Sequence, residues 1–195
     1  SFKITADSQR VVYLADQTTA GRSELYSTAL DGTGNTKLNA AISIPAGKVT
    51  HFQLTPDGSM VIYRADAAAL LRFELFQVSV TGGSATRLHA PLTLTRSIAA
   101  DFAVPSNAHA IFRGDVDGLA GQTRLYAAPL NGSAPVRLDS NTLADGDVTE
   151  FQITADGAKV AYLADTTNDG SMELHAAWGA PDCSALPDRW GAVNM

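Results

Sequence analysis

Residues 52–63 read FQLTPDGSMVIY, and two other segments repeat this phrase: residues 2–13 read FKITADSQRVVY and residues 151–162 read FQITADGAKVAY. In each, an alternating apolar–polar run is followed by a turn containing Asp and then by a second, mostly apolar run. Phe102 opens a fourth copy, so the four leading phenylalanines are 50, 50 and 49 residues apart. A constant period of this length is the signature of a repeat architecture.

Each copy also contains two further short strands. In the first copy the third strand is ELYSTAL at 24–30, the turn pair Asp-Gly follows at 31–32, and TKL at 36–38 forms a short fourth strand. Asp-Gly between apolar runs is typical of a β-hairpin, and no segment shows a helical period. Four antiparallel strands in a unit of about 50 residues predict a propeller blade. The sequence therefore predicts an all-β chain of four β-propeller blades with four antiparallel strands each.

The period also sets the expected boundaries. We expect a four-blade propeller, or part of a larger one, over residues 1–186 and a C-terminal tail at 187–195. The expected blades span about residues 2–51, 52–101, 102–150 and 151–186. In the third blade VPSNAHA at 104–110 replaces the Asp-Gly turn, which predicts a distorted first turn. The sequence leaves open whether CSALP at 183–187 forms the fourth strand of the last blade.

The combined pattern F-x-[IL]-[TS]-x-D-G, [VI]-x-[YF]-x-[AG]-D and [EQR]-[LI]-[YF] resembles the TolB-like, PD40-type (WD40-like) propeller repeat over residues 2 to about 178. The resemblance implies a non-catalytic, protein-binding or scaffolding module, exported to the bacterial periplasm or cell surface. The same repeat builds propellers of prolyl-oligopeptidase-like enzymes. The alternative is therefore part of the substrate-gating propeller of such a serine hydrolase, with its catalytic domain outside this chain.

Propellers that resemble this chain usually have six or more blades. Four blades therefore predict either a small closed ring or an open arc whose apolar flanks need covering. An open arc is expected to form a homodimer or to be completed by a missing remainder of a larger propeller.

Composition excludes several classes of function. The chain has a net charge of −6 and no cluster of Lys or Arg, which argues against a nucleic-acid partner. No apolar run is long enough for membrane insertion. The single cysteine, Cys183, excludes an internal disulfide and a multi-cysteine metal site. The chain lacks a G-x-S-x-G, H-E-x-x-H or phosphate-loop motif, so we expect no catalysis within it.

The loop lengths indicate where a partner would bind. The links between the second and third strands are long, as are the links between blades, whereas the other connections are tight turns. In an antiparallel meander these two long sets lie at the same end. Binding residues concentrate on loops held by a rigid scaffold. We therefore expect any site at this end, or in the channel mouth that it surrounds.

An aspartate begins each link between the second and third strands. The four residues are Asp16, Asp66, Asp115 and Asp165. An aspartate at a strand end can accept a hydrogen bond from a backbone N–H two residues on and so fix its loop. The last of these segments, DTTNDG at 165–170, also resembles the start of a calcium loop, with oxygen ligands at Asp165, Thr167 and Asp169 before a glycine. Calcium is thus the one cofactor to consider, although Ala176 stands where the closing Glu is expected.

The segment AAALLRF at 67–73 differs from its polar counterparts. If exposed, Leu70, Leu71 and Phe73 would form an apolar patch of the kind that binds a protein partner. If the loop folds down, they would add to the core. The sequence leaves both readings open. In the second strands, Arg64 and Arg113 are expected to pair with carboxylates between blades.

Overall fold

The computed structural model describes residues 1–93, 96–117, 121–139, 146–165 and 171–178. Within these residues the strands form four antiparallel sheets, here called blades 1 to 4. Blade 1 contains β1 (Phe2–Ile4), β2 (Arg10–Ala15), β3 (Glu24–Ala29) and β4 (Thr36–Lys37). Blade 2 contains β5 (Val49–Leu54), β6 (Met60–Ala65), β7 (Glu74–Ser79) and β8 (Thr86–Arg87).

Blade 3 contains β9 (Ile98–Ala103), β10 (His109–Gly114), β11 (Arg124–Pro129) and β12 (Val136–Arg137). Blade 4 contains β13 (Val148–Ile153), β14 (Lys159–Asp165) and β15 (Met172–Trp178). Each sheet follows chain order, so every blade is a simple meander. The all-β propeller prediction is confirmed. The segment 183–187, considered as a further strand, and the tail 187–195 lie outside the described residues.

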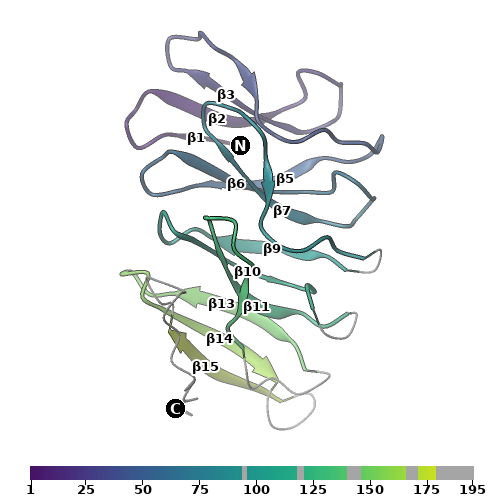
Figure 1. The fold of residues 1–195 in the computed structure, drawn as a ribbon, viewed down its shortest axis with the longest axis vertical. Coiled ribbons are helices and arrows are strands. Elements are labelled where there is room, and N and C mark those ends of the chain that lie inside the picture. Colours follow the sequence, from purple (N-terminus) through teal and green to yellow (C-terminus); the bar gives the residue numbers. More distant parts are fainter. Residues whose placement is uncertain (94–95, 118–120, 140–145, 166–170, 179–195) are drawn as a thin grey trace.

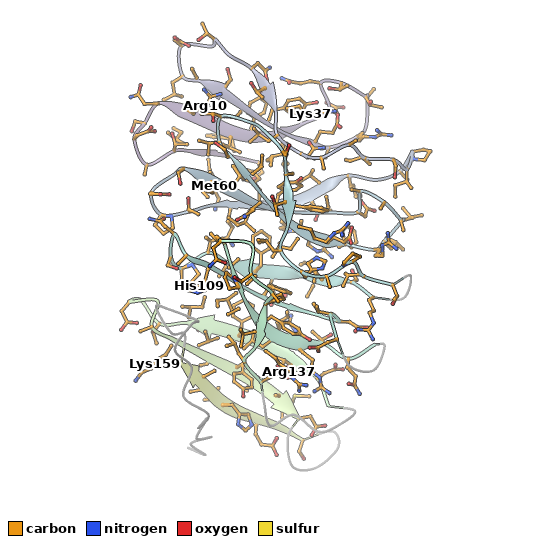
Figure 2. The ribbon with its side chains drawn as sticks, viewed as in Figure 1. Arg10, Lys37, Met60, His109, Arg137 and Lys159 are labelled. Carbon is orange, nitrogen blue, oxygen red and sulfur yellow. The ribbon has the colours of Figure 1, made fainter. Side chains whose placement is uncertain are left out.

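The blades follow one another along the long axis of the molecule, with blade 1 at one end and blade 4 at the other (Figure 1). The residues that begin the second strands also follow one another down one side of the stack (Figure 2); they are Arg10, Met60, His109 and Lys159. Blades 1 and 4 are separated by the other two, so the described residues form an open stack and not a closed four-blade ring. The described residues contain no helix, and therefore no helix that could span a membrane.

The core lies between consecutive blades. Alternate residues of a strand point to opposite faces, so each blade packs one face on each neighbour. Blade 1 contributes aliphatic residues, Val12 and Leu25, to its contact with blade 2. Blade 2 contributes Phe52, Tyr63 and Phe76 to the same contact. The rings of Tyr63 and Phe76 stack with their centres 5.3 Å apart. Each blade thus has an aliphatic face toward the next blade and an aromatic face toward the previous one.

The same pairing recurs twice. The aliphatic face of blade 2 and the aromatic face of blade 3 include Ile62, Leu75, Phe102, Phe112 and Tyr126. The aliphatic face of blade 3 and the aromatic face of blade 4 include Ile111, Leu125, Phe151 and Tyr162. Burying these apolar side chains is the main source of stability for the stack.

The first turn of blade 3 departs from the other three, as predicted. In blade 2 the turn is closed by backbone hydrogen bonds from Thr55 N–H to the Met60 carbonyl and from Gly58 N–H to the Thr55 carbonyl. Blades 1 and 4 repeat both bonds. In blade 3 the Ser106 hydroxyl oxygen instead accepts from the backbone N–H groups of Ala108 and His109, both at 3.2 Å.

Candidate functional site

The long links gather at one end of the stack, here called the loop end. Hydrogen bonds join the links between blades to the links between second and third strands at three places along the stack. They run from Ser43 N–H to the Ala67 carbonyl (2.8 Å), from Phe73 N–H to Ser97 Oγ (3.1 Å) and from Thr123 N–H to Asp147 Oδ1 (2.6 Å). The loop end is therefore a connected surface held by the blades beneath it.

The aspartates that begin these links hold them in place. Asp16 Oδ2 accepts from the Gly21 N–H at 3.0 Å, and Asp115 Oδ2 accepts from the Gly121 N–H at 2.6 Å. The accepted N–H lies five residues ahead in the first case and six in the second, not two as expected. A carboxylate at this position therefore closes a wider loop than a simple turn.

Asp66 makes the same bond and a second one. Its Oδ2 accepts from the Leu71 N–H at 3.3 Å, while its Oδ1 accepts from the Lys48 N–H at 2.7 Å. Asp66 is buried, so these bonds compensate the loss of its hydration. One side chain thus fixes both the 67–73 loop and the link that enters β5.

Only one of the three calcium ligands proposed from the sequence is among the described residues. Asp165 is buried at the end of β14, whereas Thr167 and Asp169 lie outside the described residues. The described residues contain no group of three or more His, Cys, Asp or Glu side chains that could hold a metal ion. Calcium binding at 165–170 stays a prediction, which melting temperatures in excess calcium and in chelator would test.

The 67–73 loop separates its apolar residues. Leu70 and Leu71 are exposed, at 60% and 69%. Phe73 is half-buried, and the Arg64 guanidinium lies over its ring at 3.6 Å from the ring centre. Burial lowers the pKa of Arg64 to about 10, which leaves it charged at neutral pH, as a cation–π contact requires. Two leucines therefore project from a loop whose base is fixed.

The backbone of Leu71 is strained. Its φ is +61°, in the left-handed region, and the equivalent residues are glycines: Gly21 at +76° and Gly121 at +91°. A left-handed backbone costs a residue with a side chain about 1 kcal/mol or more. The sequence carries a signal of this strain that the predictions above missed, because leucine stands where two other copies have glycine.

A second candidate surface lies on the inner side of the stack, where Cα atoms of the first strands β5 and β9 lie within 8 Å of each other. A cleft of about 410 Å³, here called the inner cleft, opens between β1, β5 and β9. Its lining residues are Lys3, His51, Phe52, Gln53, Ala100, Asp101 and Phe102. These seven residues include no serine, threonine or cysteine that could act as a nucleophile. They offer hydrogen-bonding and charged groups suited to binding.

The arginine predictions are corrected in part by the structure. Arg113 binds Asp101 through two bonds of 2.7 and 2.8 Å, but this pair lies within blade 3 and not between blades. The contacts between blades go to carbonyl oxygens. Arg113 donates to Val148 at 2.6 Å, and Arg64 donates to Ile98 at 3.0 Å. Long side chains here reach the first strand of the next blade, where backbone groups accept them.

No protein-family model matches the chain, and no curated protein matches it in sequence. Solved structures do match in fold. TolB from Acinetobacter baumannii aligns with 90% of this chain at a TM-score of 0.54 and 17% identity, and this chain covers 40% of it. A putative TolB from Agrobacterium tumefaciens aligns with 90% at 0.55 and 16% identity, with 59% of it covered.

A peptidase matches equally well. The puromycin-hydrolyzing peptidase of Mycobacterium tuberculosis aligns with 90% of this chain at a TM-score of 0.58 and 15% identity, with 29% of it covered. The chain thus spans between 29% and 59% of the length of these three proteins. At these identities the likeness shows the fold alone. The sequence resemblance to TolB-like and peptidase propellers is confirmed at that level.

Proposed function

We propose that this chain is a non-catalytic propeller module that binds a protein partner at its loop end, in a bacterial protein exported to the periplasm or cell surface. The observation that carries the proposal is the exposure of Leu70 and Leu71 on a loop fixed by Asp66. The TolB-like fold supports both the binding role and the export. Its partners would also include a second copy or further propeller blades.

The strain at Leu71 supports a binding role. Glycine would relieve the backbone at this position, as it does at Gly21 and Gly121. Exposure of a leucine there also costs free energy, because its apolar surface stays in water. Strained, exposed apolar residues are typical of binding sites. A partner with an apolar pocket that takes Leu70 and Leu71 would recover part of that cost.

Site-specific crosslinking tests the proposal. A photoreactive amino acid would replace Leu70 in one variant and Ala20, the equivalent exposed residue of blade 1, in a matched control. Both variants would be expressed in an exporting bacterium, with fractionation to establish location. We expect a discrete crosslinked protein from position 70 only. Equal products from both positions, or none, would remove the support for this surface.

A double variant makes the test sharper. Leu70→Ala with Leu71→Gly gives this loop the residues of blade 1 while keeping the backbone N–H that Asp66 binds. The fold should be retained, and a partner captured by the unchanged chain should be lost. Capture that persists in the double variant would show that the partner binds elsewhere, with the inner cleft as the next surface to mutate.

The alternative function is part of a propeller that gates a prolyl-oligopeptidase-like serine hydrolase domain. The match to a peptidase of known structure favours this candidate. A hydrolase domain encoded in the same polypeptide as residues 1–195 would support it. Crosslinking from the inner cleft, at His51, to that domain or its substrate would then be expected in place of crosslinking from Leu70.

A further inference from the structure

The two outer faces of the stack formed by the described residues carry most of its exposed large apolar residues. The aromatic face of blade 1, here called the aromatic flank, exposes Phe2, Ile4 and Leu30. The aliphatic face of blade 4, here called the aliphatic flank, exposes Met172 and Leu174. The other exposed large apolar residues among those described are the two leucines of the loop end. Both flanks are therefore candidates for an interface.

The repeat shows what the aromatic flank is built to contact. Phe2 is 71% exposed, whereas Phe52, at the same position in blade 2, is 6% exposed. Phe52 is buried because it packs with Val12 and Leu25 on the aliphatic face of blade 1. Phe102 and Phe151 pack in the same way on blades 2 and 3. Among the described residues, Phe2 is thus the one leading phenylalanine that has no aliphatic face packed on it.

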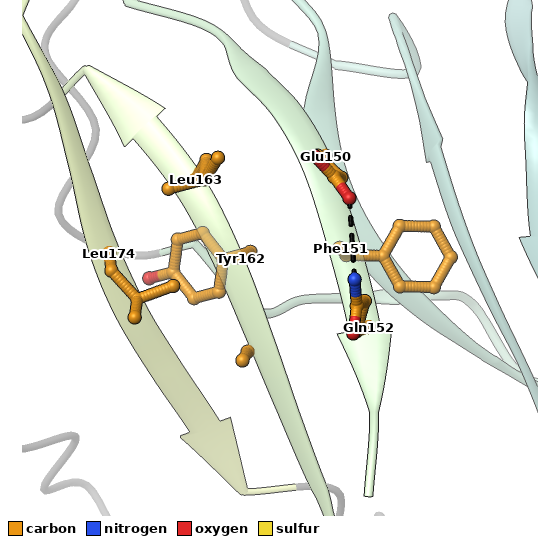
Figure 3. Close-up of a pocket in the computed structure, with 7 residues that line it drawn as sticks. Glu150, Phe151, Gln152, Tyr162, Leu163 and Leu174 are labelled. Atoms are coloured by element: carbon orange, nitrogen blue, oxygen red, sulfur yellow. Dashed lines mark hydrogen bonds between the residues drawn. The ribbon is translucent and has the colours of Figure 1, made fainter.

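The aliphatic flank carries the matching receptor. A hollow of about 360 Å³ lies on blade 4 between β13, β14 and β15 (Figure 3). Ala161, Leu163 and Leu174 line it. They stand at the repeat positions of Val12, Leu14 and Leu25, the side of blade 1 that receives Phe52. Phe151 also lines the hollow, and Figure 3 shows its ring pointing away from Leu174.

We propose that the two flanks bind each other between two copies of this chain, with Phe2 of one copy in the hollow of the other. The contact reproduces the aromatic-on-aliphatic pairing found at all three internal contacts. A second copy is the fitting occupant because this chain carries both halves of the interface. Head-to-tail contacts form closed rings when the rotation returns to the start. Two stacks of four blades would close as eight, within the size range of propellers.

This inference does not depend on the proposed function, because the loop end belongs to neither flank. The test is the mass of the purified chain in solution, measured by light scattering from low to high micromolar concentration. We expect a dimer. Phe2→Asp and Leu174→Asp should each weaken the dimer by on the order of 100-fold. Each substitution places a buried charge in both flank-to-flank contacts of the eight-blade ring. Ala20→Asp, at an exposed residue outside the flanks, is the matched control and should leave the dimer intact.

Mixing the two flank variants tests the head-to-tail arrangement. A pair made of one Phe2→Asp copy and one Leu174→Asp copy keeps one contact unchanged, so the mixture should associate more tightly than either variant alone. A like-to-like interface would gain nothing from mixing. Circular dichroism and melting of each variant separate loss of association from loss of folding. A monomer at all concentrations, a dimer unaffected by both substitutions, an open series of larger species, or no gain on mixing would overturn the proposal.

Discussion

The imidazole of His89 accepts the backbone N–H of Leu75 through Nε2 at 3.0 Å. Its Nδ1 lies 2.7 Å from the carbonyl oxygen of Ala90. Because a backbone N–H can only donate, Nε2 must be unprotonated, and Nδ1 then carries the proton that bonds to Ala90. The buried His89 is therefore neutral in the folded chain.

The same position in blade 1 is an asparagine that makes both bonds. Asn39 Oδ1 accepts from the Leu25 N–H at 2.8 Å, and its Nδ2 donates to the Ala40 carbonyl at 2.9 Å. An amide and a neutral imidazole are thus interchangeable at this place in the repeat. The amide cannot titrate, whereas the imidazole can.

This difference predicts an acid-sensitive blade 2. Burial lowers the pKa of His89 to about 4, from an ordinary value of 6.5. The unfolded chain takes up its proton near pH 6.5 and the folded chain only near pH 4, so the free energy of unfolding falls as the pH falls between these values. We expect a loss of about 2 kcal/mol between pH 7 and pH 5, measured by urea unfolding.

His89→Asn is the matched variant, because it copies Asn39. It should fold at pH 7 and lose most of the dependence of stability on pH between 7 and 5. His89→Ala should be less stable at both pH values, since the Leu75 N–H then lacks its acceptor. An unchanged pH dependence in His89→Asn would assign the acid sensitivity to other groups.

A second prediction concerns the first turn of blade 2. The pKa of the exposed Asp57 is lowered, chiefly by the hydrogen bond from the Thr55 hydroxyl at 2.6 Å and also by the Ser59 N–H. Thr55→Val removes the first donor, so the pKa of Asp57 should rise toward its ordinary value. Thr55→Ser keeps the hydroxyl and should keep the low pKa. Carboxyl chemical shifts followed by NMR titration would measure both, and equal pKa values in the two variants would contradict the assignment.

A third prediction uses the strain at the loop end. Leu71→Gly should raise the free energy of unfolding by about 0.5–1 kcal/mol, because relief of the left-handed backbone exceeds the entropy gained by the unfolded chain. Gly21→Ala is the reciprocal change in blade 1. No atom lies within 4 Å of the added Cβ, so its expected loss of about 1 kcal/mol reports the backbone alone. Urea unfolding measures both, and a destabilised Leu71→Gly would show that Leu71 makes stabilising contacts.

The repeat period made the blades predictable, because every blade buries the same positions and so keeps the same landmarks. It could not reveal the acceptor at the end of the fourth strand. That position is Asn39, His89 and Asp139 in turn, three side chains that share a hydrogen-bonding role but little chemical likeness. A repeat is found by matching identical or similar residues. A hydrogen-bonding role that an amide, an imidazole and a carboxylate can each perform leaves no such match.

The direction of the 67–73 loop was equally hidden. Its composition fits either burial or exposure, and only the backbone decides between them. Asp66 and the left-handed Leu71 turn the two leucines outward, while Arg64 holds Phe73 against the blade. The arginines were misjudged for a related reason. Their partners are largely backbone carbonyls, which the amino-acid sequence does not display.

Blade 3 has an arginine in place of the buried glutamate of blades 1 and 2, and its carboxylate lies at a different position of the repeat. In blades 1 and 2 the third strand begins with a buried glutamate that binds a cation on the fourth strand, as in Glu24–Lys37 at 3.0 Å. Blade 3 has the buried Arg124 there instead. Its acceptor position holds Asp139, which lies 3.9 Å from Arg124 and 3.1 Å from Arg137. Asp139 also accepts the Leu125 N–H at 2.9 Å, so a single carboxylate accepts hydrogen bonds from Leu125 and Arg137 and forms an ion pair with Arg124.

The final prediction follows from that replacement. Asp139→Asn preserves an acceptor for the backbone N–H but removes the negative charge that pairs with the buried Arg124, so it should cost about 3 kcal/mol. Adding Arg124→Glu restores the arrangement of blade 1, with a glutamate facing Arg137 and an amide as acceptor, and should recover most of the loss. Arg124→Glu alone should also destabilise, because it places two carboxylates together in the core. Urea unfolding of the three variants gives the coupling energy of the pair. A double variant no more stable than the additive sum of the single changes would show that the two side chains act independently.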